Sequence, residues 1–261
     1  MTDYETLRVE TDESVARITL DSPAGFNSLT TTMAEELFTV ITELNDDDAV
    51  RCLVLTGTDA FCSGADLTAL DGDERDAPRL RRLASMLHDS VIQLHQADTP
   101  VVTGINGVAA GAGVGLALGG DLVVMAEDAT IQFAYPEIGL TGDGGATFLL
   151  PRLVGLRRAK EIALLDEPIG ADHAVSLGLV TESVSADSFD ERLDAVAQRL
   201  ADGPTAALSA TKRLLTESFD RDLAQQLAEE TDAIATAART EDYQRGYAAF
   251  FDDDDPAFVG R

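Results

Sequence analysis

Apolar runs separated by polar breaks along the first two thirds of the chain predict strands that alternate with helices. Residues 6–21 hold two apolar runs around a polar turn, which is typical of a β-hairpin. Residues 28–48 repeat apolar positions at helical spacing after a capping threonine. A continuous apolar run follows at 49–57, of the kind found in parallel strands that are buried on both faces. A helix over about 75–96, a strand over 100–106, a glycine-rich helix and a strand over 121–127 complete the pattern. The alternation predicts an α/β fold with parallel strand pairing.

After about Ala159 the pattern changes to one helix after another. The segment 221–240 places Leu223, Leu227, Ile234 and Ala238 on one helical face. An apolar face needs cover, either from the α/β core or from another copy of the chain. We therefore divide the chain into a core of residues 1–200 and a helical C-terminal region of residues 201–261. The acid-rich segment 70–78 is predicted to be a solvated, mobile loop.

The charge balance is strongly acidic, with 47 Asp and Glu against 19 Lys and Arg and a net charge of -28. Such self-repulsion destabilises a compact state unless salt screens it. We therefore expect a halophilic, cytoplasmic protein whose fold persists as KCl is raised to molar concentration. The same charge opposes nucleic acid and anionic membranes as partners. The apolar run 101–126 holds seven glycines, which favours strand, helix and strand over a membrane span.

Two glycine-bearing junctions carry the candidate chemistry, "FCSGADL" at 61–67 and "NGVAAGAGVGLALGGD" at 106–121. Each lies where a predicted strand ends, so its bare backbone N–H groups can approach a ligand. Two such donors on one oxygen form an oxyanion hole, whereas either junction alone is better explained by close helix packing or a tight turn. Cys52 and Cys62 are expected to be small core residues. No metal-ligand spacing and no nucleotide-binding fingerprint occurs, so no metal and no separate cofactor is expected.

Taken together, "AFCSGADL" and "INGVAAGAGVGLALGGDLVV" resemble the signatures of the enoyl-CoA hydratase/isomerase (crotonase) family. "LPRLVGLRRAKEIALL" and "EDYQRGYAAFFDDDDPAFVG" extend the resemblance over nearly the whole chain. It implies a crotonase-like repeated ββα core with a helical C-terminal trimerisation region, assembled as a trimer or hexamer. It also implies an acyl-CoA thioester substrate that brings its own coenzyme A. By the resemblance, the oxyanion-hole donors are the backbone N–H groups of Ala65 and Ala112. The substrate pocket would include Gly64, Asp66, Gly111, Gly115, Tyr135 and His88.

Two acids in "AYPEIGLTGDGG", Glu137 and Asp143, compete for the catalytic role. Hydratases of the family use two glutamates; the place of the first falls on Gly115, and that of the second on Tyr135, with Glu137 beyond it. Asp143 matches an aspartate of members that shift double bonds, and the segment is similar to the epoxyphenylacetyl-CoA isomerase branch. One carboxylate suffices to move a proton between two carbons of an enolate. Asp143 is the predicted base and Glu137 the second candidate; alternatively, Asp143 caps the next helix and Glu137 is a surface acid.

Two further features bear on the substrate. His88 falls where the family's aroyl-CoA dehalogenases carry a histidine, but those enzymes have a tryptophan at the place of Tyr135, and this chain has none. The segments that often supply bases for the CoA phosphates read "DSPAGFNSL" and "FFDDDDP", without a base. Arginines elsewhere, backbone N–H groups or screening cations must serve instead. The sequence thus predicts an enoyl-CoA isomerase, with an enoyl-CoA hydratase or a catalytically silent oligomeric binding homologue as alternatives.

Overall fold

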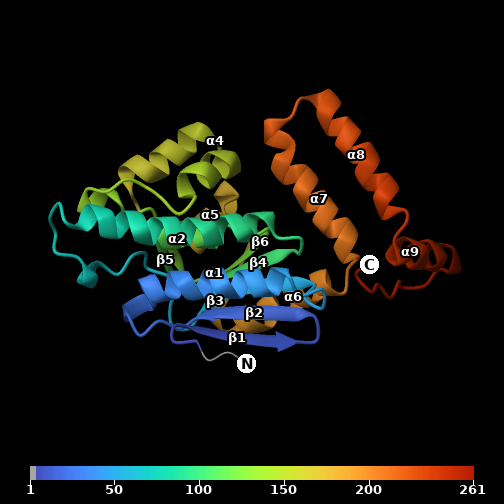
Figure 1. The fold of residues 1–261 in the computed structure, drawn as a ribbon, viewed down its shortest axis with the longest axis horizontal. Coiled ribbons are helices and arrows are strands. Elements are labelled where there is room, and N and C mark those ends of the chain that lie inside the picture. The colour runs from blue at the N-terminus through green and yellow to red at the C-terminus, as the bar shows by residue number, and fades with distance from the viewer. Residues whose placement is uncertain (1–3) are drawn as a thin grey trace.

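The computed structural model describes residues 4–261, and its centre is a six-stranded sheet in the order β1-β2-β3-β4-β6-β9 (Figure 1). A second sheet has the order β5-β7-β8. The strands are β1 (Leu7–Asp12), β2 (Val15–Leu20), β3 (Cys52–Gly57), β4 (Val101–Ile105), β5 (Val108–Ala110), β6 (Leu122–Ala126), β7 (Thr130–Gln132), β8 (Ile169–Gly170) and β9 (Glu182–Val184). Only the β1-β2 hairpin is antiparallel in the main sheet. The predicted α/β class with parallel pairing is confirmed.

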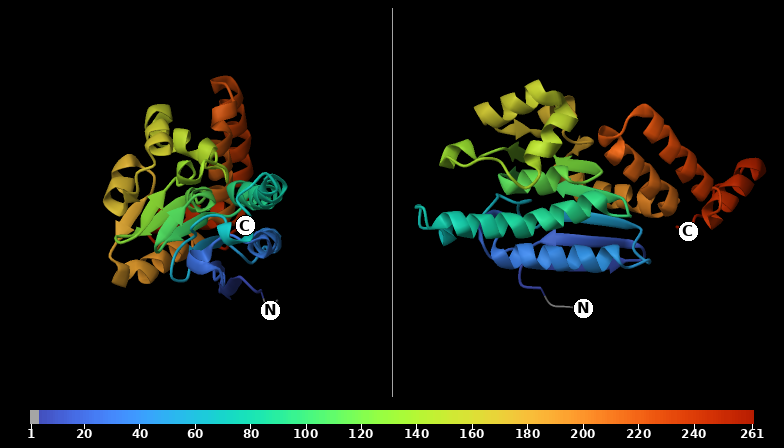
Figure 2. Two further views of the ribbon diagram at one scale, coloured as in Figure 1. Left: turned by 90° about the vertical axis from the view of Figure 1, so that its left-hand side faces the viewer. Right: turned by 45° about the horizontal axis from the view of Figure 1, so that its top comes forward.

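Helices cover both faces of the main sheet. They are α1 (Thr31–Asn45), α2 (Asp76–Gln96), α3 (Ala112–Leu118), α4 (Ala146–Leu165), α5 (Ala171–Leu177), α6 (Phe189–Ala201), α7 (Thr205–Glu217), α8 (Leu223–Ala237) and α9 (Glu241–Asp252). Helices α1 and α2 pack side by side on one face, and α6 lies on the other (Figures 1 and 2). Gly104 in β4 permits the close approach of α6, since a Cβ there would lie 2.5 Å from Leu193 Cδ2.

The pattern of buried positions explains the local structure. Strand β2 alternates, with Ala16, Ile18 and Leu20 fully buried, whereas all six residues of β3 are buried between neighbouring strands. Helix α1 begins at Thr30, whose side chain accepts a hydrogen bond from Met33 N at 3.1 Å. This bond satisfies one of the free N–H groups at the helix start.

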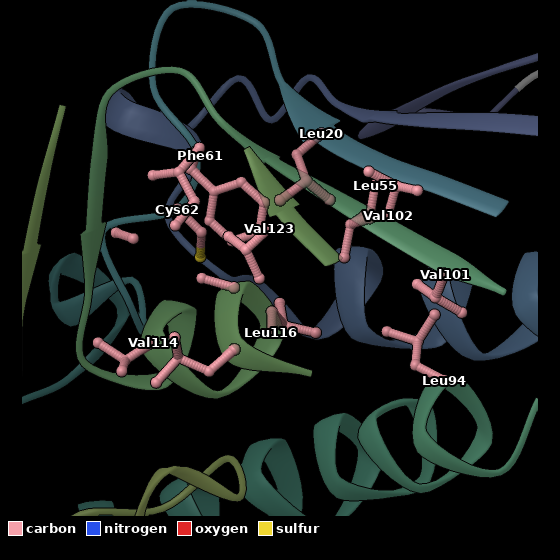
Figure 3. Close-up of a cluster of buried hydrophobic side chains, with 14 of the residues drawn as sticks. Leu20, Leu55, Phe61, Cys62, Leu94, Val101, Val102, Val114, Leu116 and Val123 are labelled. Carbon is pink, nitrogen blue, oxygen red and sulfur yellow. The ribbon is translucent and has the colours of Figure 1, made fainter. Parts of the chain in front are cut away.

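A cluster of buried side chains joins the end of β3 to α3 (Figure 3). Phe61 and Cys62 lie in it together with Val114 and Leu116 of α3 and residues of the main sheet. Both cysteines are free and buried, as predicted. The 61–67 junction is therefore anchored in the core on one side.

One expectation about regular structure was wrong, and four short strands were missed. The short strands β5, β7, β8 and β9 were not predicted, and the last two interrupt the segment expected to be wholly helical. Residues 70–78 were expected to form a solvated, mobile loop; residues 71–75 are exposed and lie outside helices and strands, and α2 begins at Asp76, close to the predicted helix start. The buried Asp76 carboxylate accepts hydrogen bonds from the backbone N–H groups of Asp71, Gly72 and Asp73. These bonds fix the turn that leads into α2.

Helices α7, α8 and α9 extend away from the sheet (Figures 1 and 2). Lys212 of α7 ties the first of them to the core through an ion pair with Asp121 at 2.9 Å. Helix α6 ends at Ala201 and α7 begins at Thr205, next to our boundary at residue 200, but the division into two regions stays a prediction. Among the helices of residues 4–261, none is both long and apolar enough to cross a bilayer.

Candidate active site

The two glycine junctions meet backbone to backbone. Gly64 and Gly111 both have positive φ angles, +92° and +54°. A Cβ on Gly64 would lie 3.0 Å from the carbonyl oxygen of Ala110 and 3.5 Å from the backbone nitrogen of Ala112. Glycine is needed at Gly64 both for its φ and for this approach. The contact brings Ala65 and Ala112 to the same place.

The amide N–H groups of Ala65 and Ala112 are left without acceptors. Leu29 N donates to the Gly64 carbonyl at 2.7 Å, and Leu29 O accepts from Asp66 N at 3.0 Å. In this parallel bridge Leu29 bonds to both neighbours of Ala65, so the N–H of Ala65 itself points away from Leu29. Ala112 is the first residue of α3, where an N–H has no intrahelical partner. Within residues 4–261 neither amide makes a hydrogen bond, and both residues line one cavity.

This cavity has a volume of about 440 Å³ and mainly apolar walls. Helix α2 contributes one face at helical spacing, through Leu80, Leu83, Ala84 and Leu87. Further apolar walls come from Leu29, Leu67, Ile138 and Leu140. Its charged lining residues are Arg81, Glu137 and Asp143. A site of this composition suits an apolar ligand that presents one polar group to fixed donors.

Asp143 belongs to a glycine-rich turn, residues 142–145, which we name the Asp143 turn. Its side chain is 32% exposed and accepts a hydrogen bond at Oδ1 from the hydroxyl of Tyr135. The side chain does not cap α4, since no side-chain cap is formed there and Ala146 N donates to the backbone carbonyl of Asp143 at 3.1 Å. The alternative in which Asp143 serves as a helix cap is therefore wrong.

Tyr135 is a buried donor to this carboxylate. Its ring packs against Phe133 with the centroids 4.9 Å apart, and 7% of the residue is exposed. Burial, and next the negative charge of Asp143, raise the pKa of the Tyr135 hydroxyl above its ordinary value. The hydroxyl therefore stays protonated and continues to donate.

His88 of α2 supports the Asp143 turn from outside the cavity. Gly144 N donates to His88 Nε2 at 3.1 Å, and the same nitrogen lies 3.9 Å from Asp143 Oδ2. A backbone N–H can only donate, so His88 Nε2 is the acceptor of this hydrogen bond. His88 was predicted as a pocket residue, but it does not line the cavity.

Glu137 lies at the mouth of the cavity on the 3₁₀ helix Pro136–Ile138. It is exposed, and its Oε1 accepts a hydrogen bond from Gln132 Nε2 at 3.0 Å. The two candidate acids thus share one cavity in different environments.

Two predicted pocket residues have other tasks. Gly115 lies within α3 directly under the Asp143 turn, and a Cβ there would be 1.6 Å from the carbonyl oxygen of Gly144. Asp66 caps the 3₁₀ helix Leu67–Ala69, where its carboxylate accepts from Thr68 N at 3.0 Å and from the Thr68 hydroxyl. Neither is among the residues that line the cavity, and their place in the substrate pocket stays a prediction.

Sequence reasoning placed only His88 of α2 in the pocket and missed Arg81 and the apolar residues of that helix that line the cavity. The signal was present as the apolar repeat at Leu80, Leu83 and Leu87, but nothing in the sequence places α2 beside the two junctions. Within residues 4–261 no group of three or more His, Cys, Asp or Glu side chains is arranged to hold a metal ion.

Comparisons with known proteins agree with the resemblance. A sequence model of the family described as enoyl-CoA hydratase/isomerase matches residues 10–261. The chain belongs to the enoyl-CoA hydratase/isomerase family. Among its relatives, a protein named "Probable enoyl-CoA hydratase" from Rhodobacter capsulatus is 37% identical over 99% of both chains. The 1,2-epoxyphenylacetyl-CoA isomerase of Escherichia coli is 34% identical over 96% of this chain and 97% of its own.

The fold of the enoyl-CoA hydratase/isomerase family is confirmed by solved structures. The crystal structure of an enoyl-CoA hydratase from Bacillus anthracis matches with a TM-score of 0.93 at 30% identity, over 98% of this chain and 100% of that one. The protein is thus an acyl-CoA enzyme with the crotonase fold. The names of its relatives include both hydratases and isomerases, and a shared fold does not determine the reaction.

Proposed function

We propose that this enzyme shifts a double bond in an enoyl-CoA thioester, with Asp143 as the acid and base. The observation that carries the proposal is the single partly buried carboxylate beside two unpartnered amide donors. Asp143, Ala65 and Ala112 line the same cavity, and the Tyr135 hydroxyl holds the Asp143 carboxylate in place. A site with one positioned base and an oxyanion hole suits proton transfer within one substrate.

In the proposed reaction, the N–H groups of Ala65 and Ala112 donate to the thioester carbonyl oxygen. Asp143 removes a proton from C2 of a 3-enoyl-CoA, and the electron pair of the broken C–H bond delocalises into a dienolate. The negative charge on oxygen is stabilised by the two amides. The protonated Asp143 then returns the proton to C4, and the double bond moves to C2–C3. Atoms and charge balance without another reactant.

Hydration is the second candidate, because Glu137 lines the same cavity and relatives of the chain are named hydratases. Adding water across a double bond needs groups that orient the water and transfer its proton. Here the carbonyl of Gly144 occupies the space beside Gly115, and Glu137 is exposed and bonded to Gln132. We therefore place isomerisation first.

The test is conversion of a 3-enoyl-CoA to the conjugated 2-enoyl-CoA in molar KCl, followed by the absorbance of the conjugated thioester. Hydration of a 2-enoyl-CoA is measured in parallel with the same protein. We expect isomerisation to be the faster reaction and to be lost in Asp143→Asn. Hydration without isomerisation would overturn the proposal, and no turnover by a folded protein that binds acyl-CoA would favour a silent homologue.

We also propose that the protein self-associates as a trimer or hexamer through its C-terminal helices. Their apolar residues remain exposed in the single chain: Leu223 and Ile234 on α8 are 75% and 72% exposed, and Phe250 on α9 is 81% exposed. Surfaces of this kind are normally covered by a partner. Light scattering after size-exclusion chromatography tests this, and a monomer at micromolar concentration would contradict it.

We further propose that the enzyme works in a salt-rich cytoplasm, as the net charge of -28 suggests. Circular dichroism should show the folded spectrum gained or kept as KCl rises to molar concentration. Its loss on adding KCl would contradict the proposal.

A further inference from the structure

The net negative charge of this protein repels the negative charge of its proposed substrate. An acyl-CoA carries several negative charges on its phosphates, whereas the chain has a net charge of -28. The segments 21–29 and 250–256, where similar enzymes often carry bases for the CoA phosphates, contain no basic residue. Most basic side chains elsewhere in residues 4–261 are occupied by acidic partners. On α2 itself, for example, Arg79 pairs with Asp71 at 3.0 Å and Arg82 with Glu35 at 3.5 Å.

A few basic side chains have neither an ion pair nor a hydrogen bond within residues 4–261. They are Arg81, Arg157, Lys160, Arg199 and Arg239. Of these five, only Arg81 lines the cavity that holds Ala65, Ala112 and Asp143. An unpaired guanidinium in an acidic protein is a ready partner for an anion, and its planar fork matches the oxygens of phosphates and carboxylates.

The position of Arg81 sets it apart from the reacting atoms. It lies between Leu80 and Leu83, which both line the cavity, and it is exposed, whereas Leu87 farther along α2 is fully buried. Among the described residues it forms no ion pair with either cavity carboxylate: the only such contact to Asp143 there comes from His88, and Glu137 accepts a hydrogen bond from Gln132. Its charge is therefore free for a group of the ligand that lies away from the thioester carbonyl.

We propose that Arg81 is the specificity-determining residue that binds an anionic group of the acyl-CoA substrate. The group is either a phosphate of coenzyme A or a carboxylate at the far end of the acyl chain. The inference rests on the proposed function in one respect, that the ligand is an acyl-CoA thioester; it does not depend on which reaction follows.

Direct binding separates the two sources. Isothermal titration calorimetry with the whole chain would use three saturated, unreactive thioesters. Hexanoyl-CoA is the reference ligand, and hexanoyl-pantetheine lacks the phosphates. The CoA thioester of adipic acid adds a carboxylate at the far end of the acyl chain. Wild type, Arg81→Gln, Arg81→Lys and the control Arg199→Gln are compared at one KCl concentration at which all four show the folded circular dichroism spectrum. Arg199 is likewise exposed and unpaired, but it lies on α6, across the sheet from α2.

If Arg81 binds a phosphate, Arg81→Gln weakens hexanoyl-CoA binding about tenfold, as expected for one charged hydrogen-bonded contact, and leaves hexanoyl-pantetheine unchanged. If it binds an acyl carboxylate, only the adipic thioester is weakened. In either case Arg81→Lys retains part of the affinity and Arg199→Gln all of it. Equal binding by wild type and Arg81→Gln for all three ligands, or an equal loss in Arg199→Gln, would overturn the assignment.

Failure of the proposed reaction is distinguishable from failure of this inference. Arg81-dependent binding without isomerase turnover would leave Arg81 assigned and refute the reaction. Isomerase turnover with no effect of Arg81 on binding would do the reverse.

Discussion

Asp143 and Glu137 lie six residues apart and line the same cavity, but their surroundings differ. Asp143 is half-buried and accepts a hydrogen bond from a buried tyrosine, in a turn that rests on α3. Glu137 is exposed on a short 3₁₀ helix and accepts from Gln132. This difference is why we propose the chemistry for the aspartate, which a buried tyrosine holds, and not for the proline-flanked glutamate. Four substitutions test that difference.

The largest expected effect is that of Asp143→Asn, which keeps the shape of the side chain and removes its basicity. We expect kcat for isomerisation to fall by about 10³-fold, within the range for loss of a general acid–base. Steady-state rates would measure it, with circular dichroism as the control for folding. Activity within tenfold of wild type would remove Asp143 from the mechanism.

Gly115→Ala should have the next largest effect, because the new Cβ would occupy the position of the Gly144 carbonyl. The Asp143 turn must move, and a displacement of about 1 Å can cost about 10² in rate. Overpacking of this kind also costs about 1–3 kcal/mol of unfolding free energy.

Gly170→Ala is the matched control for Gly115→Ala, since among the described residues, its two chain neighbours apart, no atom lies within 4 Å of its Cβ position. Chemical denaturation and kcat should both separate the two variants. If both behave like wild type, Gly115 does not support the turn.

Tyr135→Phe removes the donor to Asp143 while keeping the ring, and we expect about a tenfold loss of kcat, as for one hydrogen bond to a charged group. It also gives a pH test. Because the folded state raises the pKa of Tyr135, the protonated hydroxyl favours folding fully below about pH 10, the ordinary tyrosine value. Above that pH wild type should lose this contribution progressively, and Tyr135→Phe should not. Parallel pH dependences of unfolding free energy would contradict the assigned environment.

The smallest effect is expected for Glu137→Gln, which keeps a polar side chain at the mouth of the cavity. We expect isomerisation rates within about twofold of wild type, as is usual for an exposed substitution that leaves the fold intact. A loss that matches that of Asp143→Asn would mean that both acids act together, and would favour hydration.

The long elements of the fold were predictable because their signal is local. The buried run of β3 and the apolar repeat of α1 need no knowledge of the rest of the chain. Strands β5, β7, β8 and β9 span two or three residues each, too few to show a period of two, and they exist only because neighbouring backbone completes their hydrogen bonds.

Of the candidate site, the close approach of the backbone at the two glycine junctions was predictable from the sequence. The small residues around Ala65 and Ala112 indicate close approach from the sequence alone, and the structure brings the two junctions into contact. Side-chain directions were not predictable in the same way. Asp66 turns to its own helix start, and Arg81 reaches the cavity only through the packing of α2.

The contact between Gly115 and the Gly144 carbonyl also bears on how the reaction of this enzyme could change during evolution. A glutamate at position 115 has no room until the 142–145 segment is rebuilt, and rebuilding that segment first would displace Asp143. Either change alone is therefore expected to lower the proposed isomerase activity. Because the two sites are in contact, we expect the effects of substitutions at position 115 and in residues 142–145 to be non-additive.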